Sequence, residues 1–93
     1  MFLIRLPKFP LGRLVATPGV LAAVPKIQIQ NALDRHAHGD WGIIPDENKR
    51  SNDQALQGGG RLFSAYLSTK EVRFWIITEQ DRSATTVLLP EEY

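Results

Sequence analysis

The chain has 93 residues, of which 43% are hydrophobic and 23% are charged, and its formal net charge is +1. This composition is typical of a globular protein and not of a disordered tail, and a chain so short buries only ~60–65% of its unfolded surface, so we expect one domain over residues 1–93. The absence of cysteine excludes disulfides, thiolate catalysis and cysteine-ligated zinc.

The charges are unevenly distributed along the chain. Residues 34–93 hold seven basic and ten acidic residues, whereas residues 1–33 hold no acid and four cations, Arg5, Lys8, Arg13 and Lys26. Such an arm could steer the protein towards nucleic acid or an acidic protein surface, with Arg82 adding to it. Because no aromatic residues are interleaved with these cations in the manner of a nucleic-acid stripe, we favour a solvated surface and a protein partner.

The N-terminal segment, Met1 to Leu14, is broken by Pro7 and Pro10. It therefore lacks the uninterrupted apolar run of a signal peptide or membrane helix, and we expect a cytoplasmic protein that does not engage membranes. Within it, Phe2 to Leu6 is a candidate edge strand, and Leu11 to Ala16 is a short apolar run.

Two helices are expected next. Thr17 is a suitable N-cap and Pro18 suits the first helical position, which predicts a short helix over Pro18 to Ala23 that ends before Pro25. The second helix covers Lys26 to His38, with Ile29, Leu33 and Ala37 at i, i+4 and i+8 and Gly39 at the expected C-terminal cap. This helix is the natural cover for a sheet.

A third helix is predicted from a cap at Asp46 to about Gln57. Its apolar face is thin, while Asn48 and Asn52 form a polar i, i+4 stripe, so we expect it on the outside or against a partner. The triple glycine that follows lacks the Lys-Ser/Thr pair of a nucleotide-binding loop, and no other motif implies a cofactor.

The last third of the chain predicts a three-stranded antiparallel meander. Its strands are rich in β-branched and aromatic residues and are joined by connections of about four residues: Arg61 to Leu67, Val72 to Glu79 and Ala84 to Leu89. The predicted fold class is therefore α+β, with two to three short helices packed on a small antiparallel sheet.

His36-Ala37-His38 with Asp40 offers three metal ligands on paper, but imidazoles two residues apart on a helix diverge by ~200°, so we predict no metal site. His38 is explained by the helix dipole. His36 lies on the apolar helix face, where it is either a general base beside arginines or a buried histidine with satisfied hydrogen bonds, which we favour.

The polar string from Glu79 to Thr86 is the second candidate site. Arg82 offers a planar fork for phosphate or carboxylate, and Ser83 and Thr85 offer hydroxyls beside it. The same residues are also ordinary turn and strand residues. In the loop Gly39-Asp40-Trp41-Gly42, the indole is directed either into the core or onto a partner.

Four segments together resemble a group of small bacterial proteins carried by plasmids and other mobile elements, usually labelled plasmid-related proteins or restriction-modification subunits. They are Leu14 to Gly19, Arg35-His36 with Gly39 to Gly42, Arg61 to Tyr66, and Trp75 to Pro90. The family has no established activity, and its setting implies a role towards host defence or plasmid upkeep.

Two functional hypotheses are compatible with the sequence. The first is a binding protein that presents a set of polar and aromatic residues to a partner: Asp40, Trp41, Asn48, Asn52, Arg61, Arg73, Arg82 and Ser83. The resemblance implies that such a protein could inhibit a host defence system. The second is a metal-independent ribonuclease of the toxin kind, with His36 as base, Thr85 beside it and a phosphate clamp made by Arg61, Arg73 and Arg82. The lack of a convincing acid-base pair favours the first.

Overall fold

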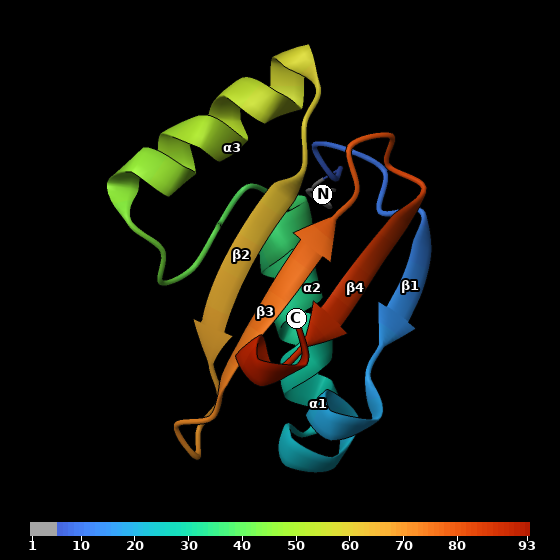
Figure 1. Cartoon of the computed structure of the whole chain (residues 1–93), viewed down its shortest axis with the longest axis vertical. Coiled ribbons are helices and arrows are strands. Elements are labelled where there is room, and N and C mark those ends of the chain that lie inside the picture. The colour runs from blue at the N-terminus through green and yellow to red at the C-terminus, as the bar shows by residue number, and fades with distance from the viewer. Residues whose placement is uncertain (1–5) are drawn as a thin grey trace, which may run out of the picture.

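The computed structural model describes residues 6–93. Along the chain it contains β1 (Arg13–Ala16), α1 (Pro18–Ala23), α2 (Lys26–Ala37), α3 (Asp46–Gly58), β2 (Leu62–Leu67), β3 (Arg73–Thr78), β4 (Ala84–Leu88) and a short 3-10 helix, η1 (Pro90–Glu92). Helices and a sheet in this order confirm the predicted α+β class (Figure 1).

The sheet has the strand order β1-β4-β3-β2. The pairs β2–β3 and β3–β4 are antiparallel, so the C-terminal meander is confirmed. A fourth strand, β1, pairs in parallel with β4 and makes the sheet mixed. The apolar run of Leu11 to Ala16 indicated no partner for β1, because its register, with Leu14 beside Thr85, joins opposite ends of the chain. The expected strand over Phe2 to Leu6 lies outside the described residues, apart from Leu6, which is in no strand.

The helices begin and end close to the predicted positions. Thr17 caps α1 by accepting a hydrogen bond from the Val20 N–H. The helix α2 ends at Ala37, one residue early, and His38 is its C-cap. At α3 the predicted cap is wrong by one position: Pro45 is the N-cap and Asp46 is the first helical residue, where its charge favours the helix dipole.

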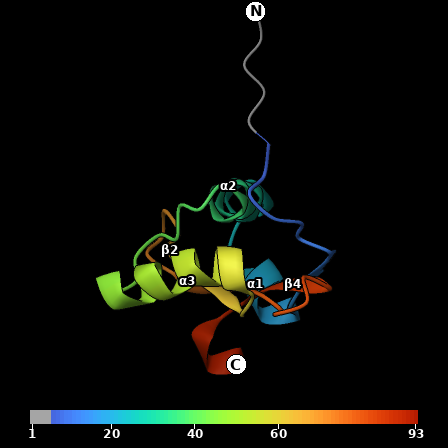
Figure 2. The ribbon, with the colours of Figure 1, turned by 90° about the horizontal axis from the view of Figure 1, so that it is seen from above.

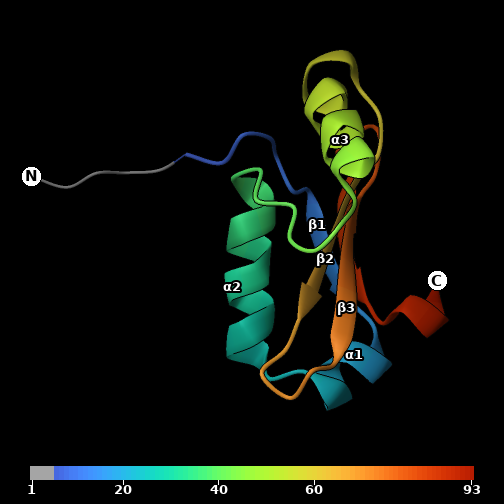
Figure 3. The ribbon, with the colours of Figure 1, turned by 90° about the vertical axis from the view of Figure 1, so that its left-hand side faces the viewer.

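The two faces of the sheet have different cover. Figure 3 shows α2 along one side of the strands and the C-terminal turn on the other, and Figure 2 shows the same separation from above. The face towards α2, called here the inner face, holds a core made by α1, α2 and the strands: Val20, Val24, Ile29, Ala32, Tyr66, Phe74, Ile76 and Val87. A second cluster joins α3 and the Trp41 loop to β2 through Phe9, Trp41, Ile44, Ala55, Leu62 and Ala65.

The opposite face, called here the outer face, is only partly covered. By strand alternation it carries Phe63 of β2, Trp75 and Ile77 of β3, and Thr86 and Leu88 of β4. Its cover comes from η1 and Tyr93, which packs edge-on against Trp75. Across residues 6–93, no helix combines the length and apolar character that crossing a membrane requires.

Candidate functional site

His36 is enclosed between α2 and the inner face of the sheet, with none of its surface exposed. The ring of Phe9 meets the imidazole edge-on at 5.3 Å between centroids, and the ring of Trp41 meets it at 5.5 Å. A histidine on the apolar face of this helix was predicted, and the structure places it in the protein interior.

The imidazole is part of a chain of buried hydrogen bonds. Its Nδ1 contacts the hydroxyl of Ser64, and its Nε2 lies 2.9 Å from the hydroxyl oxygen of Thr78. The Thr78 and Thr85 hydroxyl oxygens are 2.7 Å apart, and Thr85 donates to the carbonyl oxygen of Leu11 at 2.7 Å. We call this set the His36 chain.

The last acceptor fixes the hydrogen-bond directions from Leu11 back to the Nε2 atom of His36. A carbonyl oxygen only accepts, so the Thr85 hydroxyl donates to Leu11, and the Thr78 hydroxyl in turn donates to Thr85. Thr78 can then only accept from His36, which requires a proton on Nε2. The geometry thus assigns a proton to Nε2. When the ring is neutral, Ser64 donates to the unprotonated Nδ1.

Burial keeps the imidazole of His36 neutral. Desolvation lowers the pKa of His36 from 6.5 to about 4, and no carboxylate among residues 6–93 offsets that shift. His36 is therefore neutral at pH 7, closed off from solvent and bonded through both nitrogens. It lacks the access to a substrate that a general base needs.

Arg82 does not join His36. Its guanidinium donates to the carbonyl oxygens of Gly60 at 2.6 Å, Ala55 at 2.9 Å, and Glu79 and Gln80 each at 3.1 Å. These are the carbonyls at the end of α3 and in the β3–β4 turn. Thr85 is linked to His36 through Thr78, but Arg82 does not join them, because its guanidinium is hydrogen-bonded to backbone carbonyl oxygens. The predicted trio of base, hydroxyl and phosphate clamp is therefore not assembled. Ser83, beside it, is exposed. Its N–H donates to the Asp81 carboxylate at 3.0 Å, and its carbonyl oxygen accepts from the Arg13 N–H at 3.0 Å.

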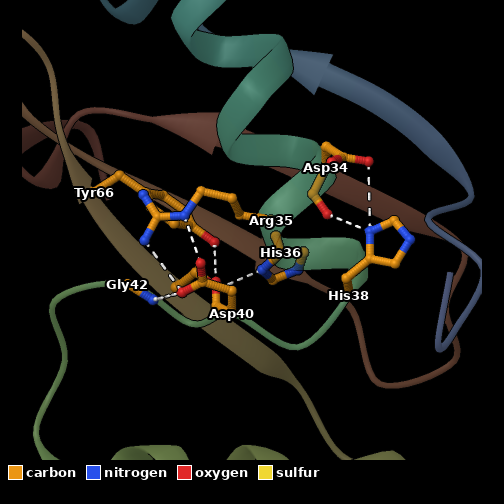
Figure 4. Close-up of polar contacts among 8 residues, drawn as sticks. Asp34, Arg35, His36, His38, Asp40, Gly42 and Tyr66 are labelled. Carbon is orange, nitrogen blue, oxygen red and sulfur yellow. Dashed lines mark hydrogen bonds and ion pairs between the residues drawn. The ribbon is translucent and has the colours of Figure 1, made fainter. Parts of the chain in front are cut away.

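The Asp40 loop is held together internally. Arg35 binds the Asp40 carboxylate at 2.7 Å and 3.1 Å, and the Tyr66 hydroxyl donates to the Asp40 carbonyl oxygen at 2.7 Å (Figure 4). The hydrogen bond from Arg35, reinforced by the Gly42 N–H, lowers the pKa of Asp40. This loop is a structural corner, and its carboxylate already has a partner.

Trp41 lies in the second core and is only 3% exposed, and its indole N–H donates to the Asp53 carboxylate at 3.1 Å. The structure therefore favours core anchoring over partner contact for this residue. His38, beside the loop, binds the Asp34 carbonyl oxygen at 2.7 Å and lies 3.4 Å from its carboxylate. Figure 4 shows His36 and His38 pointing in different directions.

The predicted polar stripe on α3 is also used by the fold. Asn52 is buried, donates to the Phe63 carbonyl oxygen at 2.7 Å and accepts from the Phe63 N–H at 3.1 Å. The side chain thus pairs with the free edge of β2 as a neighbouring strand would. Asn48 remains half-buried. A partner could form hydrogen bonds with the Asn52 amide only by breaking its hydrogen bonds to Phe63.

Two of the predicted binding residues, Arg61 and Arg73, do lie on the exposed outer face. Arg61 borders a groove of about 230 Å³, called here the outer groove, which is lined by Arg61, Phe63, Trp75, Ile77 and Tyr93. A second hollow of about 200 Å³ continues past Tyr93 towards Glu79, Thr86 and Leu88. Arg73 begins β3 on the same face as Trp75.

The aromatic rings of the outer groove are held in place by one another and by Arg61. Phe63 and Trp75 meet edge to face at 5.1 Å, and Trp75 meets Tyr93 at 5.8 Å. The Arg61 guanidinium donates to the Tyr93 hydroxyl at 2.9 Å, lies over its ring, and reaches Glu79 at 3.8 Å. The groove therefore presents ordered rings beside a cation.

The sequence does not predict that Phe63, Trp75 and Tyr93 lie together. Alternation along β3 places Trp75 on one face with Arg73 and Ile77, which is the only signal the sequence holds. Phe63 joins it through the β2–β3 register and Tyr93 through the turn after β4, and both depend on tertiary structure.

No three histidine or acidic side chains within residues 6–93 converge in a way that could hold a metal ion. Comparison with protein-family models, with curated proteins and with solved structures gives no match.

Proposed function

We propose that this chain is a binding protein that acts on a protein partner through its outer groove. The observation that carries the proposal is a division among the polar and aromatic residues. His36, Trp41, Asn52 and Arg82 are used inside the fold, whereas the rings and cation of the outer groove are solvent-accessible at the surface.

The chemistry of the outer groove supports a protein partner. Trp, Tyr and Arg are the residues in which binding energy concentrates at protein interfaces, and Trp75, Tyr93 and Arg61 lie together here. The groove is mainly apolar and carries both signs of charge at its rim, with Arg61 beside Glu79. A surface built for nucleic acid phosphates carries a more uniform positive charge.

The ribonuclease alternative has less support. It needs a base within hydrogen-bond reach of a ribose hydroxyl and an arginine free to bind phosphate. His36 is enclosed and neutral, and Arg82 is bonded to backbone carbonyl oxygens. Arg61 and Arg73 lie on the outer face, across the sheet from His36. A binding role requires neither residue to be accessible.

The resemblance to mobile-element proteins supports a partner in the bacterial host. We therefore extend the proposal to an accessory protein that occupies a surface of a host defence component. This extension depends on the binding role and adds no chemistry of its own.

The test compares capture of host proteins by the wild type and by matched surface variants at native expression. The double variant Arg61→Ala and Tyr93→Ala removes exposed atoms of the outer groove, since Tyr93 is 69% exposed. The control Ile27→Ala removes a side chain that is 61% exposed on α2, across the sheet. We expect a stoichiometric partner with the wild type and the control, and at least about tenfold less with the double variant.

Two results contradict the proposal: capture of the same partner by the double variant at wild-type yield, or no stoichiometric partner at all. Cleavage of RNA by purified wild type, abolished by His36→Gln in a variant that stays folded, would establish the ribonuclease instead.

A further inference from the structure

The strand β1 has a free edge. Its Arg13 N–H donates to the Ser83 carbonyl oxygen at 3.0 Å, and the Thr17 N–H donates to the Val87 carbonyl oxygen at 3.1 Å. In a strand the backbone groups of alternate residues point to the same side, so residues 13, 15 and 17 face β4. Leu14 and Ala16 consequently direct their N–H and C=O groups away from the sheet.

Nothing in residues 6–93 pairs with those two residues on the outer side, and Figure 1 shows β1 as the outermost element there. The opposite edge of the sheet differs, because β2 is partly covered by the Gly42 bridge and by Asn52. The free edge of β1 is therefore the main unpaired backbone surface of the described sheet.

Few features of β1 protect this edge. Proteins protect free edges with short strands, proline, bulges and charged side chains. The strand β1 is four residues long and carries Arg13 at its first position, but it has no proline. Its side chains are apolar and accessible, with Leu14 56% exposed and Val15 37% exposed. Such an edge fits an extended strand from another chain.

A second copy of β1 fits this edge when it runs antiparallel. A residue whose backbone N–H and C=O groups point away from β4 can form hydrogen bonds only with such a residue of the second copy. Leu14 of one copy therefore lies opposite Ala16 of the other, and the two Val15 side chains meet on the two-fold axis. About four backbone hydrogen bonds form. Arg13 lies opposite Thr17 of the second copy and ~14 Å along the strand from the other Arg13, so like charges do not oppose each other.

We propose that the protein forms a symmetric dimer in which the outer edges of two β1 strands pair and join the two sheets into one. The apolar Val15 contact on the two-fold axis and the separation of the two Arg13 side chains favour a second copy over a foreign strand. Because the paired edge is only four residues long, the area buried in this interface is below the ~1,200 Å² of a standard stable interface. We therefore expect a weak dimer with a dissociation constant in the micromolar range.

A single introduced cysteine reports this register, because the chain has no cysteine of its own. In the proposed dimer, Val15→Cys places two thiols opposite each other at a non-hydrogen-bonded pair, where Cα atoms ~4.5 Å apart permit a disulfide. We expect a covalent dimer under mild oxidation at about 100 µM protein. Leu14→Cys is the matched control on the same strand, because its thiol lies opposite Ala16 and should cross-link at least about tenfold more slowly.

Sedimentation equilibrium of the unmodified protein gives an independent readout. The weight-average mass should rise from 10.5 kDa towards twice that value as concentration increases. Leu14→Pro should abolish the rise while leaving the fold intact, because its lost N–H points outward and the bonds to β4 remain.

Four results overturn the proposal. Three are a monomer at all concentrations, equal cross-linking of Val15→Cys and an exposed β2 control such as Leu67→Cys, and cross-linking of Val15→Cys to a different protein in place of its own copy. Preferential cross-linking of Leu14→Cys would assign the alternative register centred on Leu14 and refute the one proposed.

Discussion

At the scale of the residue, the polar side chains that stand out in the sequence are mainly structural. Two of them, His36 and Thr85, join Ser64 and Thr78 in one chain of hydrogen bonds that ends at a backbone carbonyl. Among the described residues, no buried side-chain nitrogen or oxygen lacks a hydrogen-bond partner. A buried polar chain that is fully bonded specifies one arrangement of the core, because any shift leaves a group unpaired.

The neutral state of His36 predicts how stability depends on pH. Its pKa is about 4 in the folded protein and 6.5 when exposed, so between these values the unfolded state binds a proton that the folded state excludes. Stability from this residue is complete above pH 6.5 and is lost as the pH falls towards 4. The loss is roughly 3 kcal/mol in the free energy of unfolding, measured by urea titration at several pH values.

The variant His36→Gln isolates this effect from the carboxylates, which titrate in the same range. Glutamine keeps a donor and an acceptor for Thr78 and Ser64 but binds no proton. We expect the variant to be less stable at pH 7.5 and to lose less stability on acidification. Parallel pH profiles for the two proteins would show that His36 is not buried neutral.

The sequence predicts that His36 faces the sheet, because helical spacing fixes its face. It does not predict which hydroxyls receive its nitrogens. Ser64 and Thr78 lie opposite it only through the docking of α2 on the strands, 28 and 42 residues away in the chain. The same limit explains why Arg82 was interpreted as an anion clamp: its acceptors, Ala55 and Gly60, are backbone carbonyls that side-chain composition does not reveal.

At the scale of the element, Arg82 connects the end of α3 to the β3–β4 turn. Arg82→Lys should therefore destabilise the protein by about 1.5–3 kcal/mol, because a single ammonium cannot reach carbonyls of both segments. Urea unfolding measures the change, and amide hydrogen exchange at the last turn of α3 should accelerate. The control Arg73→Lys, on the exposed start of β3, should stay within about 0.5 kcal/mol of the wild type. Equal effects of the two variants would contradict this role.

Two glycines give a second matched pair. Gly12, before β1, has a φ of +65°, and a Cβ there would lie 2.4 Å from the Arg82 carbonyl oxygen. Gly12→Ala should therefore destabilise the protein by at least about 2 kcal/mol. Gly58, at the end of α3, has open space around it, so Gly58→Ala should stabilise by about 0.5 kcal/mol. Thermal unfolding should move in opposite directions for the two variants, and a shared direction would contradict the geometry.

The elements themselves were predictable where their signals are local. Helix α1 follows from Thr17 and Pro18, and the meander follows from apolar runs joined by short turns. The local signal for β1 is only the apolar run of Leu11 to Ala16. Its pairing with β4 spans about 70 residues and depends on the tertiary fold. The shift at Asp46 shows that a cap and a first helical residue are hard to distinguish when proline precedes.

At the scale of the whole molecule, the two proposals are geometrically compatible. The groove lies on the outer face, while the dimer uses the edge of β1, so neither surface blocks the other. The two-fold axis of an antiparallel pair is perpendicular to the sheet, which places both outer faces on the same side. A dimer would thus offer two outer grooves to a partner that is itself repeated or immobilised.

This arrangement predicts avidity that depends on the β1 edge. On a surface densely coated with partner, wild type above its dimer dissociation constant should dissociate at least about tenfold more slowly than Leu14→Pro, because release of one groove leaves the other bound. With free partner in solution at low protein concentration, both proteins should bind with equal affinity, since Leu14 lies outside the groove. A loss of affinity in solution would mean that Leu14→Pro disturbs the groove. Equal dissociation from the dense surface would mean that the two grooves do not act together.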